Sequence, residues 1–130
     1  HSYIKTAEIS IDAATEQTYK IVRKGGKWDL LLRNLEFINK IPDLTQITFS
    51  FVIQKQNYHE IYDFYKLIKG IVRDKEIFFL YYSIQDWGIL TPEDYQSMKV
   101  WDKSHSDYTE FFNVVEKLRK VGDRNVSISY

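Results

Sequence analysis

Strand patterns and helix patterns alternate along the whole of this 130-residue chain, and the alternation limits the folds that it can adopt. Runs of β-branched and aromatic residues predict strands at 8–12, 45–54, 76–83 and 125–130. Apolar residues at helical spacing predict helices at 15–24, 28–40, 58–70 and 106–121, and Thr91-Pro92 starts a further short one. Strands that alternate with helices form parallel sheets with right-handed crossovers. We therefore expect an α/β domain.

Four parallel strands joined by three crossovers correspond to about half of an eight-stranded β/α barrel of the TIM type. A doubly wound sheet is the alternative. The sequence shows no internal repeat, low-complexity tract or linker, so we expect residues 1–130 to form a single domain. Because the first and last predicted elements are near the two ends, we expect the chain to be a fragment of a larger barrel.

Charge and composition exclude several classes of function. Lysine plus arginine and aspartate plus glutamate balance at 18 each, whereas nucleic-acid binding requires an excess of basic charge. No run of about 18 apolar residues is present, so we expect no membrane span. Cysteine is absent, which excludes disulfides and thiolate clusters within these residues. The composition favours a cytoplasmic protein.

The first predicted strand ends in polar residues and turns at once into a capped helix. Ser10 and Asp12 are two residues apart, so on a strand they would point to the same face. They lie at the carboxyl end of the strand, where parallel α/β folds place their ligand sites. The alternative is that these polar residues only cap the helix, which Thr15 and Glu16 also favour and which Gly25-Gly26 ends.

This segment, Ser-Ile-Asp-Ala-Ala-Thr followed by Tyr-x-x-Val-Arg-x-Gly-Gly, resembles the fourth barrel strand of the radical S-adenosylmethionine (radical SAM) enzymes. The resemblance continues through 28–35, through the 51–61 strand and loop, through 84–88, and through 100–112. The family often has a small polar cap where Lys27 stands, and one subgroup has proline where Ser106 stands. The motif on the first strand is the most specific of these matches.

The resemblance implies cofactors that this chain could hold only in part. Radical SAM enzymes bind a four-iron, four-sulfur cluster through three closely spaced cysteines, and a Gly-Gly-Glu segment holds the methionine amino group; both are missing here. The intact parent would bind the cluster and S-adenosylmethionine and cleave the latter reductively to begin radical chemistry on an unknown substrate. We expect this chain alone to be inactive, with no cofactor bound.

The resemblance and the chemistry of the side chains together nominate cofactor-binding residues and no catalytic or metal-binding ones. They are Ser10, Asp12, Arg23, Asn57, Gln85, Asp86 and Trp87. Hydroxyl and carboxylate groups suit the ribose or the sulfonium, the guanidinium suits the carboxylate, and the aromatic face suits adenine. For Arg23, Asn57 and Trp87 the alternatives are a solvated helix residue, a helix cap and a loop anchor.

Two other functions stay open at this point. The first is a non-catalytic α/β binding or assembly domain, which would associate with itself through exposed sheet edges and the apolar face of the strands. The second is an enzyme that holds magnesium between Asp12 and Asp86 at neighbouring strand ends.

Overall fold

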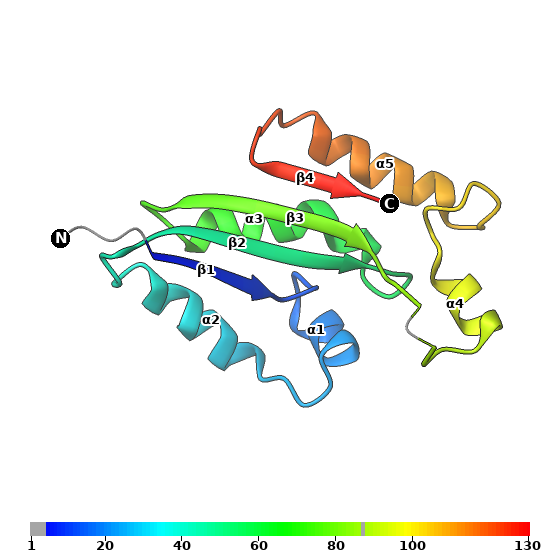
Figure 1. Ribbon diagram of the computed structural model, residues 1–130, viewed down its shortest axis with the longest axis horizontal. Helices are drawn as coiled ribbons and strands as arrows, with labels where there is room; N and C mark the ends of the chain where they lie inside the picture. Colours follow the sequence, from blue (N-terminus) through cyan, green and yellow to red (C-terminus); the bar gives the residue numbers. More distant parts are fainter. Residues whose placement is uncertain (1–4, 87) are drawn as a thin grey trace.

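The computed structural model describes residues 5–86 and 88–130, and it confirms an α/β fold built on one parallel sheet. The strands are β1 (Lys5–Ser10), β2 (Leu44–Ile53), β3 (Glu76–Ser83) and β4 (Val126–Ser129). They lie side by side in the order β1-β2-β3-β4, and every neighbouring pair is parallel (Figure 1). Each crossover therefore moves one strand along in the same direction.

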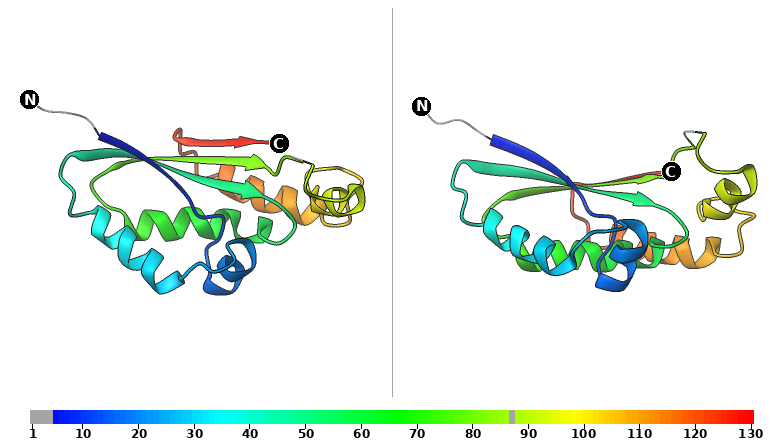
Figure 2. Two further views of the ribbon diagram at one scale, coloured as in Figure 1. Left: turned by 60° about the horizontal axis from the view of Figure 1, so that its bottom comes forward. Right: turned by 90° about the horizontal axis from the view of Figure 1, so that it is seen from below.

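The helices between the strands gather on one side of this sheet. They are α1 (Glu16–Val22), α2 (Trp28–Ile38), the 3-10 helix η1 (Tyr58–Glu60), α3 (Ile61–Ile71), α4 (Pro92–Met98) and α5 (Tyr108–Arg119). Figure 2 shows α1, α2, α3 and α5 beneath the sheet, with α4 beyond the carboxyl end of β3. A doubly wound sheet needs a reversal of strand order and helices on both faces. That alternative is wrong for the described residues, and their sheet is open rather than closed.

The core lies between the sheet and these helices and is rich in aromatic rings. Phe49 and Phe51 of β2 and Phe79 and Tyr81 of β3 are fully or almost fully buried against the helices. Phe64 of α3 lies among them, with its ring centre 5.3 Å from that of Phe51. Tilted and edge-on aromatic pairs of this kind stabilise a core by about 0.5–1.5 kcal/mol each beyond the area they bury. The packing of these side chains holds the sheet, which carries the candidate site, against the helices.

The opposite face of the sheet has no described helix across it (Figure 2). Side chains that alternate with the core residues point to it, among them Val52 of β2 and Phe78, Leu80 and Tyr82 of β3. All four are partly exposed. In a barrel this face would line the interior, and here we call it the open face.

The element boundaries differ from the predicted ones where the backbone leaves regular geometry. The first strand runs over Lys5–Ser10 rather than 8–12. Asp12 has a φ of +68°, a left-handed conformation that no strand accommodates, so it cannot share a strand face with Ser10 as we expected. The predicted helix at 58–70 begins as the 3-10 turn η1. Thr91 caps α4 as predicted, with its hydroxyl accepting from the Asp94 N–H at 3.1 Å.

Candidate functional site

The turn after β1 is held by the side chain of Asp12. Ser10 is the last residue of β1 in register with β2, and the Ile11 N–H still donates to the Ser50 carbonyl. The next donor on β2, the Val52 N–H, bonds Asp12 Oδ1 at 2.8 Å. A carboxylate oxygen therefore takes the position of a backbone carbonyl at the end of the ladder. On its other side β2 stays paired with β3 up to Ile53, so β2 continues beyond the point where β1 ends.

The other oxygen of the same carboxylate pairs with Arg23. Arg23 Nη2 lies 2.9 Å from Asp12 Oδ2, and the two side chains are 39% and 9% exposed. Burial raises the pKa of the Asp12 carboxyl above its ordinary value, while the Val52 N–H and the Arg23 guanidinium lower it. Arg23 is the C-cap of α1, and its N–H donates to the Tyr19 carbonyl at 2.8 Å.

Two glycines allow the chain to turn directly after Arg23. Gly25 has a φ of +82°, which side chains rarely tolerate. A Cβ on Gly26 would lie 2.6 Å from Tyr19 Cε2 and 2.9 Å from the Arg23 carbonyl oxygen. The Tyr19 ring in turn packs against Trp28 at the start of α2. The glycine pair therefore does more than stop a helix, because it lets α2 begin beside Tyr19 of α1.

Asn57 locks the ends of the first two strands together. Its Nδ2 donates to the Asp12 carbonyl at 3.0 Å and to the Val52 carbonyl at 2.8 Å, and its Oδ1 accepts from the Gln54 N–H at 3.0 Å. The side chain is fully buried. Its donors are occupied by the protein, so Asn57 supports the site rather than facing a ligand, and it makes no side-chain cap on η1.

Ser10 lies on the open face, next to the buried Ser50 of β2. The two hydroxyl oxygens are 2.5 Å apart. Ser10 itself is exposed, and its hydroxyl retains further hydrogen-bonding capacity toward the open face.

The predicted residues after β3 form a more exposed part of the same rim. Gln85 Nε2 donates to the Ser83 carbonyl at 3.3 Å, and Asp86 Oδ1 accepts from the Gly88 N–H at 2.8 Å. Trp87 lies outside the described residues. Gln85 also borders an apolar hollow of about 400 Å³ at the end of β3, whose other lining residues are Val52, Tyr82, Ile84, Ile89 and Leu90. The hollow opens on the side of the sheet that carries Ser10.

Two buried polar atoms in the described residues have no hydrogen-bond partner, and both belong to this rim. They are Arg23 Nε, a donor, and Gln56 Oε1, an acceptor. Gln56 precedes Asn57 in the loop after β2, and sequence reasoning gave it no role. Buried polar atoms in folded proteins are nearly always paired, so these two atoms are exceptions that a bound water, ion or ligand would satisfy.

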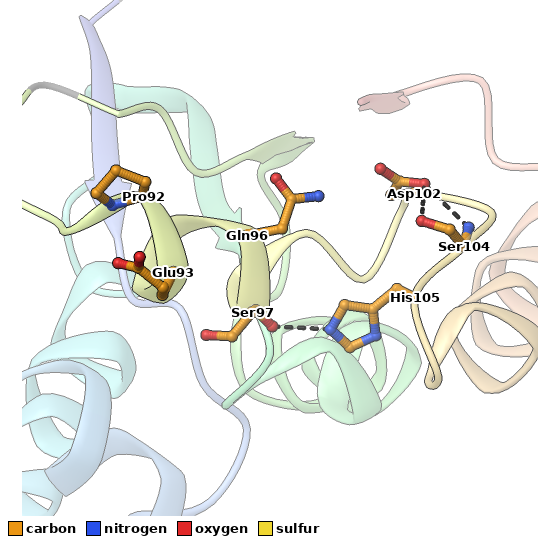
Figure 3. Close-up of a pocket in the computed structure, with 7 residues that line it drawn as sticks. All are labelled: Pro92, Glu93, Gln96, Ser97, Asp102, Ser104 and His105. Atoms are coloured by element: carbon orange, nitrogen blue, oxygen red, sulfur yellow. Dashed lines mark hydrogen bonds between the residues drawn. The ribbon is translucent and has the colours of Figure 1, made fainter.

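A larger hollow, of about 600 Å³, lies elsewhere, between α4 and the segment before α5 (Figure 3). His105 Nδ1 accepts from the Asp107 N–H at 3.0 Å, and Nε2 lies 2.8 Å from the Ser97 carbonyl oxygen. Asp102 Oδ1 accepts from both the N–H and the hydroxyl of Ser104. Both ring nitrogens are therefore occupied by backbone groups, and the ring fastens α4 instead of serving as a base.

The structure thus brings Asp12, Arg23 and Asn57 into one network and leaves Asp86 engaged with its own loop. No three histidine, aspartate or glutamate side chains within 5–86 and 88–130 group as a metal site would need. None of the helices described for the chain is long and apolar enough to cross a membrane. Comparison with protein-family models, with curated proteins and with solved structures gives no match to this chain.

Proposed function

We propose that this chain is part of a radical SAM barrel and that its strand-end rim forms one wall of the S-adenosylmethionine site. The observation that carries the proposal is Arg23, whose guanidinium is fixed by Asp12 while its Nε has no partner among the described residues. Arg23 Nε is a buried donor without an acceptor in the described part of the chain, and on this proposal the cofactor supplies the missing partner. A carboxylate suits it, because the planar guanidinium binds carboxylates at two points.

The other rim residues take different roles on this proposal. Ser10 offers a hydroxyl on the open face, and the apolar hollow beside Tyr82 and Ile84 suits a flat ring such as adenine. Asp12 has both oxygens occupied, so it holds Arg23 and does not itself contact the cofactor. Asn57 supports Asp12 in the same way.

An iron–sulfur cluster does not fit the residues present, because the chain has no cysteine. The cluster, its cysteines and the site for the methionine amino group would belong to the rest of the barrel. The chain alone should therefore bind S-adenosylmethionine only weakly, in the millimolar range, and should be inactive. The intact protein would supply the radical chemistry, on a substrate that these residues do not identify.

The proposal is tested by titrating S-adenosylmethionine into ¹⁵N-labelled chain and following Arg23 Nε–H and the Ser10 amide. We expect small, millimolar-range shifts at both signals in the wild type. The Ser10 shift should be lost in Arg23→Gln and retained in Lys24→Gln, the matched exposed cation next in sequence. Equal Ser10 shifts in both variants, or wild-type shifts confined to α4, would overturn the assignment. Iron–sulfur reconstitution of this chain should give no cluster absorbance. A stable cluster would contradict the proposal that the chain is only part of the barrel.

A second function is supported by the open face, whose apolar side chains on β3 are only partly covered. Phe78, Leu80 and Tyr82 line it, and β1 and β4 are the two edges of the sheet. We propose as the alternative a non-catalytic assembly domain that associates with itself through this face. Gel filtration should then show an oligomer that Leu80→Glu dissociates, whereas Leu30→Glu on the outside of α2 leaves it intact. A monomer at all concentrations would exclude this alternative.

A further inference from the structure

We propose that Glu60 is a positioning residue of the strand-end site, which fixes α1 so that Arg23 lies over Asp12. This inference rests on the proposed function only in treating the Asp12–Arg23 pair as part of a cofactor site. The effect of Glu60 on the ion pair is a property of the protein alone and is measured without ligand.

Glu60 is a buried carboxylate with an unusually complete set of donors. Its side chain is 5% exposed. Oε1 accepts from the N–H groups of Ala14 at 2.7 Å and Thr15 at 3.2 Å, and Oε2 accepts from the hydroxyls of Thr15 at 2.7 Å and Thr18 at 2.9 Å. Burial of a carboxylate is costly unless such bonds compensate it. These four bonds therefore hold the chain from Ala14 to Thr18 tightly to η1.

Capping of α1 does not account for these contacts. Thr15 already caps the helix, since its hydroxyl oxygen accepts from the Thr18 N–H at 3.3 Å. The bonds to Glu60 instead join segments that are 42 to 46 residues apart in sequence. Glu60 is thus a cross-link between the connection after β2 and the connection after β1.

The cross-link reaches Arg23 through the helix. Thr15 is the N-cap of α1 and Arg23 is its C-cap, so the helix spans about 12 Å between them at 1.5 Å per residue. A short rigid helix held at its start has little freedom at its end. The segment 57–60 therefore fixes both members of the ion pair, because Asn57 holds the Asp12 carbonyl and Glu60 holds the helix that carries Arg23.

The test measures the Asp12 carboxyl pKa and the Arg23 Nε–H signal by NMR in Glu60→Gln and Glu60→Ala. A glutamine oxygen still accepts from the two N–H groups, and its amide can donate to the two hydroxyl oxygens. We expect Glu60→Gln to retain the wild-type values. In Glu60→Ala the pKa of Asp12 should rise to the value found in Arg23→Gln, because the guanidinium no longer lies beside it.

If Glu60 only stabilised the fold, Glu60→Ala would lower the free energy of unfolding but leave the Asp12 pKa and the Arg23 signal at their wild-type values. That result would overturn the proposal. If Glu60→Ala does not fold, Thr18→Val removes a single donor at equal volume, and it should shift both signals part of the way. The ligand titration is separate. If Glu60→Ala changes the Asp12 pKa while S-adenosylmethionine shifts nothing in wild type, the positioning role stands and the proposed function fails.

Discussion

Asp12 and Arg23 form an ion pair that joins the end of β1 to the end of α1, with Oδ2 and Nη2 2.9 Å apart. The motif that contains them nominates each as a separate contact to a cofactor. The geometry makes them partners instead, one buried and one half-exposed, and only the arginine has a donor to spare. The orientation of the guanidinium is therefore set by the Asp12 carboxylate.

Removal of the Asp12 carboxylate should destabilise the fold markedly. Asp12→Ala leaves the Val52 N–H without its acceptor and Arg23 without its partner. We expect a loss of about 2–4 kcal/mol in the free energy of unfolding. The loss is no larger because Arg23, once its partner is removed, can turn toward water. Asp12→Asn tolerates the left-handed backbone and keeps one acceptor, so it should cost about 1 kcal/mol. Urea unfolding followed by circular dichroism measures both, and equal costs for the two variants would contradict this account.

The pKa of the Asp12 carboxyl should lie above its ordinary value. Burial raises its pKa above the ordinary value of 3.8, against the Val52 N–H and Arg23. The folded chain then binds this proton more tightly than the unfolded chain does. The contribution of Asp12 to stability is therefore complete below pH 3.8 and declines as the pH rises through the raised pKa.

Carboxyl ¹³C NMR resolves Asp12 from the other acids and measures this pKa directly. Arg23→Gln should raise the pKa further, because it removes a positive charge that favours the ionised form. Lys24→Gln is the control and should leave it unchanged. An Asp12 pKa below 3.8 in the wild type would show that the ion pair outweighs burial.

The sequence was sufficient for the parallel α/β fold, and for β3 it predicted both ends correctly, because continuous apolar strands and amphipathic helices are local patterns. It was not sufficient for the turn after β1. Alternation places Ser10 and Asp12 on one face, whereas the Asp12 backbone takes a left-handed φ and its carboxylate reaches a β2 amide 40 residues away. The roles of Glu60 and Gln56 also depend on partners distant in sequence, so no local pattern reveals them. Glu60 stands among polar neighbours such as His59 and Asp63, so its place along the chain gives no signal either.

Substitutions at Asn57 should show whether its hydrogen bonds to the backbone, rather than its burial alone, stabilise the fold. Asn57→Ala removes three hydrogen bonds and leaves two buried carbonyls and one N–H without partners, so we expect a loss of about 3 kcal/mol. Asn57→Asp should be worse at neutral pH, because a carboxylate would face the carbonyl oxygens of Asp12 and Val52. Protonation of that carboxylate restores a donor, so the deficit of Asn57→Asp should shrink at acidic pH. Urea unfolding at two pH values measures this, and a pH-independent deficit would count against it.

Loss of the His105 ring should loosen α4 without affecting the sheet. The ring joins the Ser97 carbonyl at the end of α4 to the Asp107 N–H before α5, and α4 has no buried residue of its own. In His105→Ala we therefore expect faster hydrogen exchange over 93–99, while the amides of β2 and β3 keep their protection and the unfolding free energy falls by about 1 kcal/mol or less. Ser104→Ala, which removes only a hydroxyl that bonds Asp102, serves as the matched control and should leave exchange in α4 unchanged. Uniformly faster exchange through the sheet would instead mean that His105 supports the whole fold, and unchanged exchange in α4 would mean that the ring does not fasten this helix.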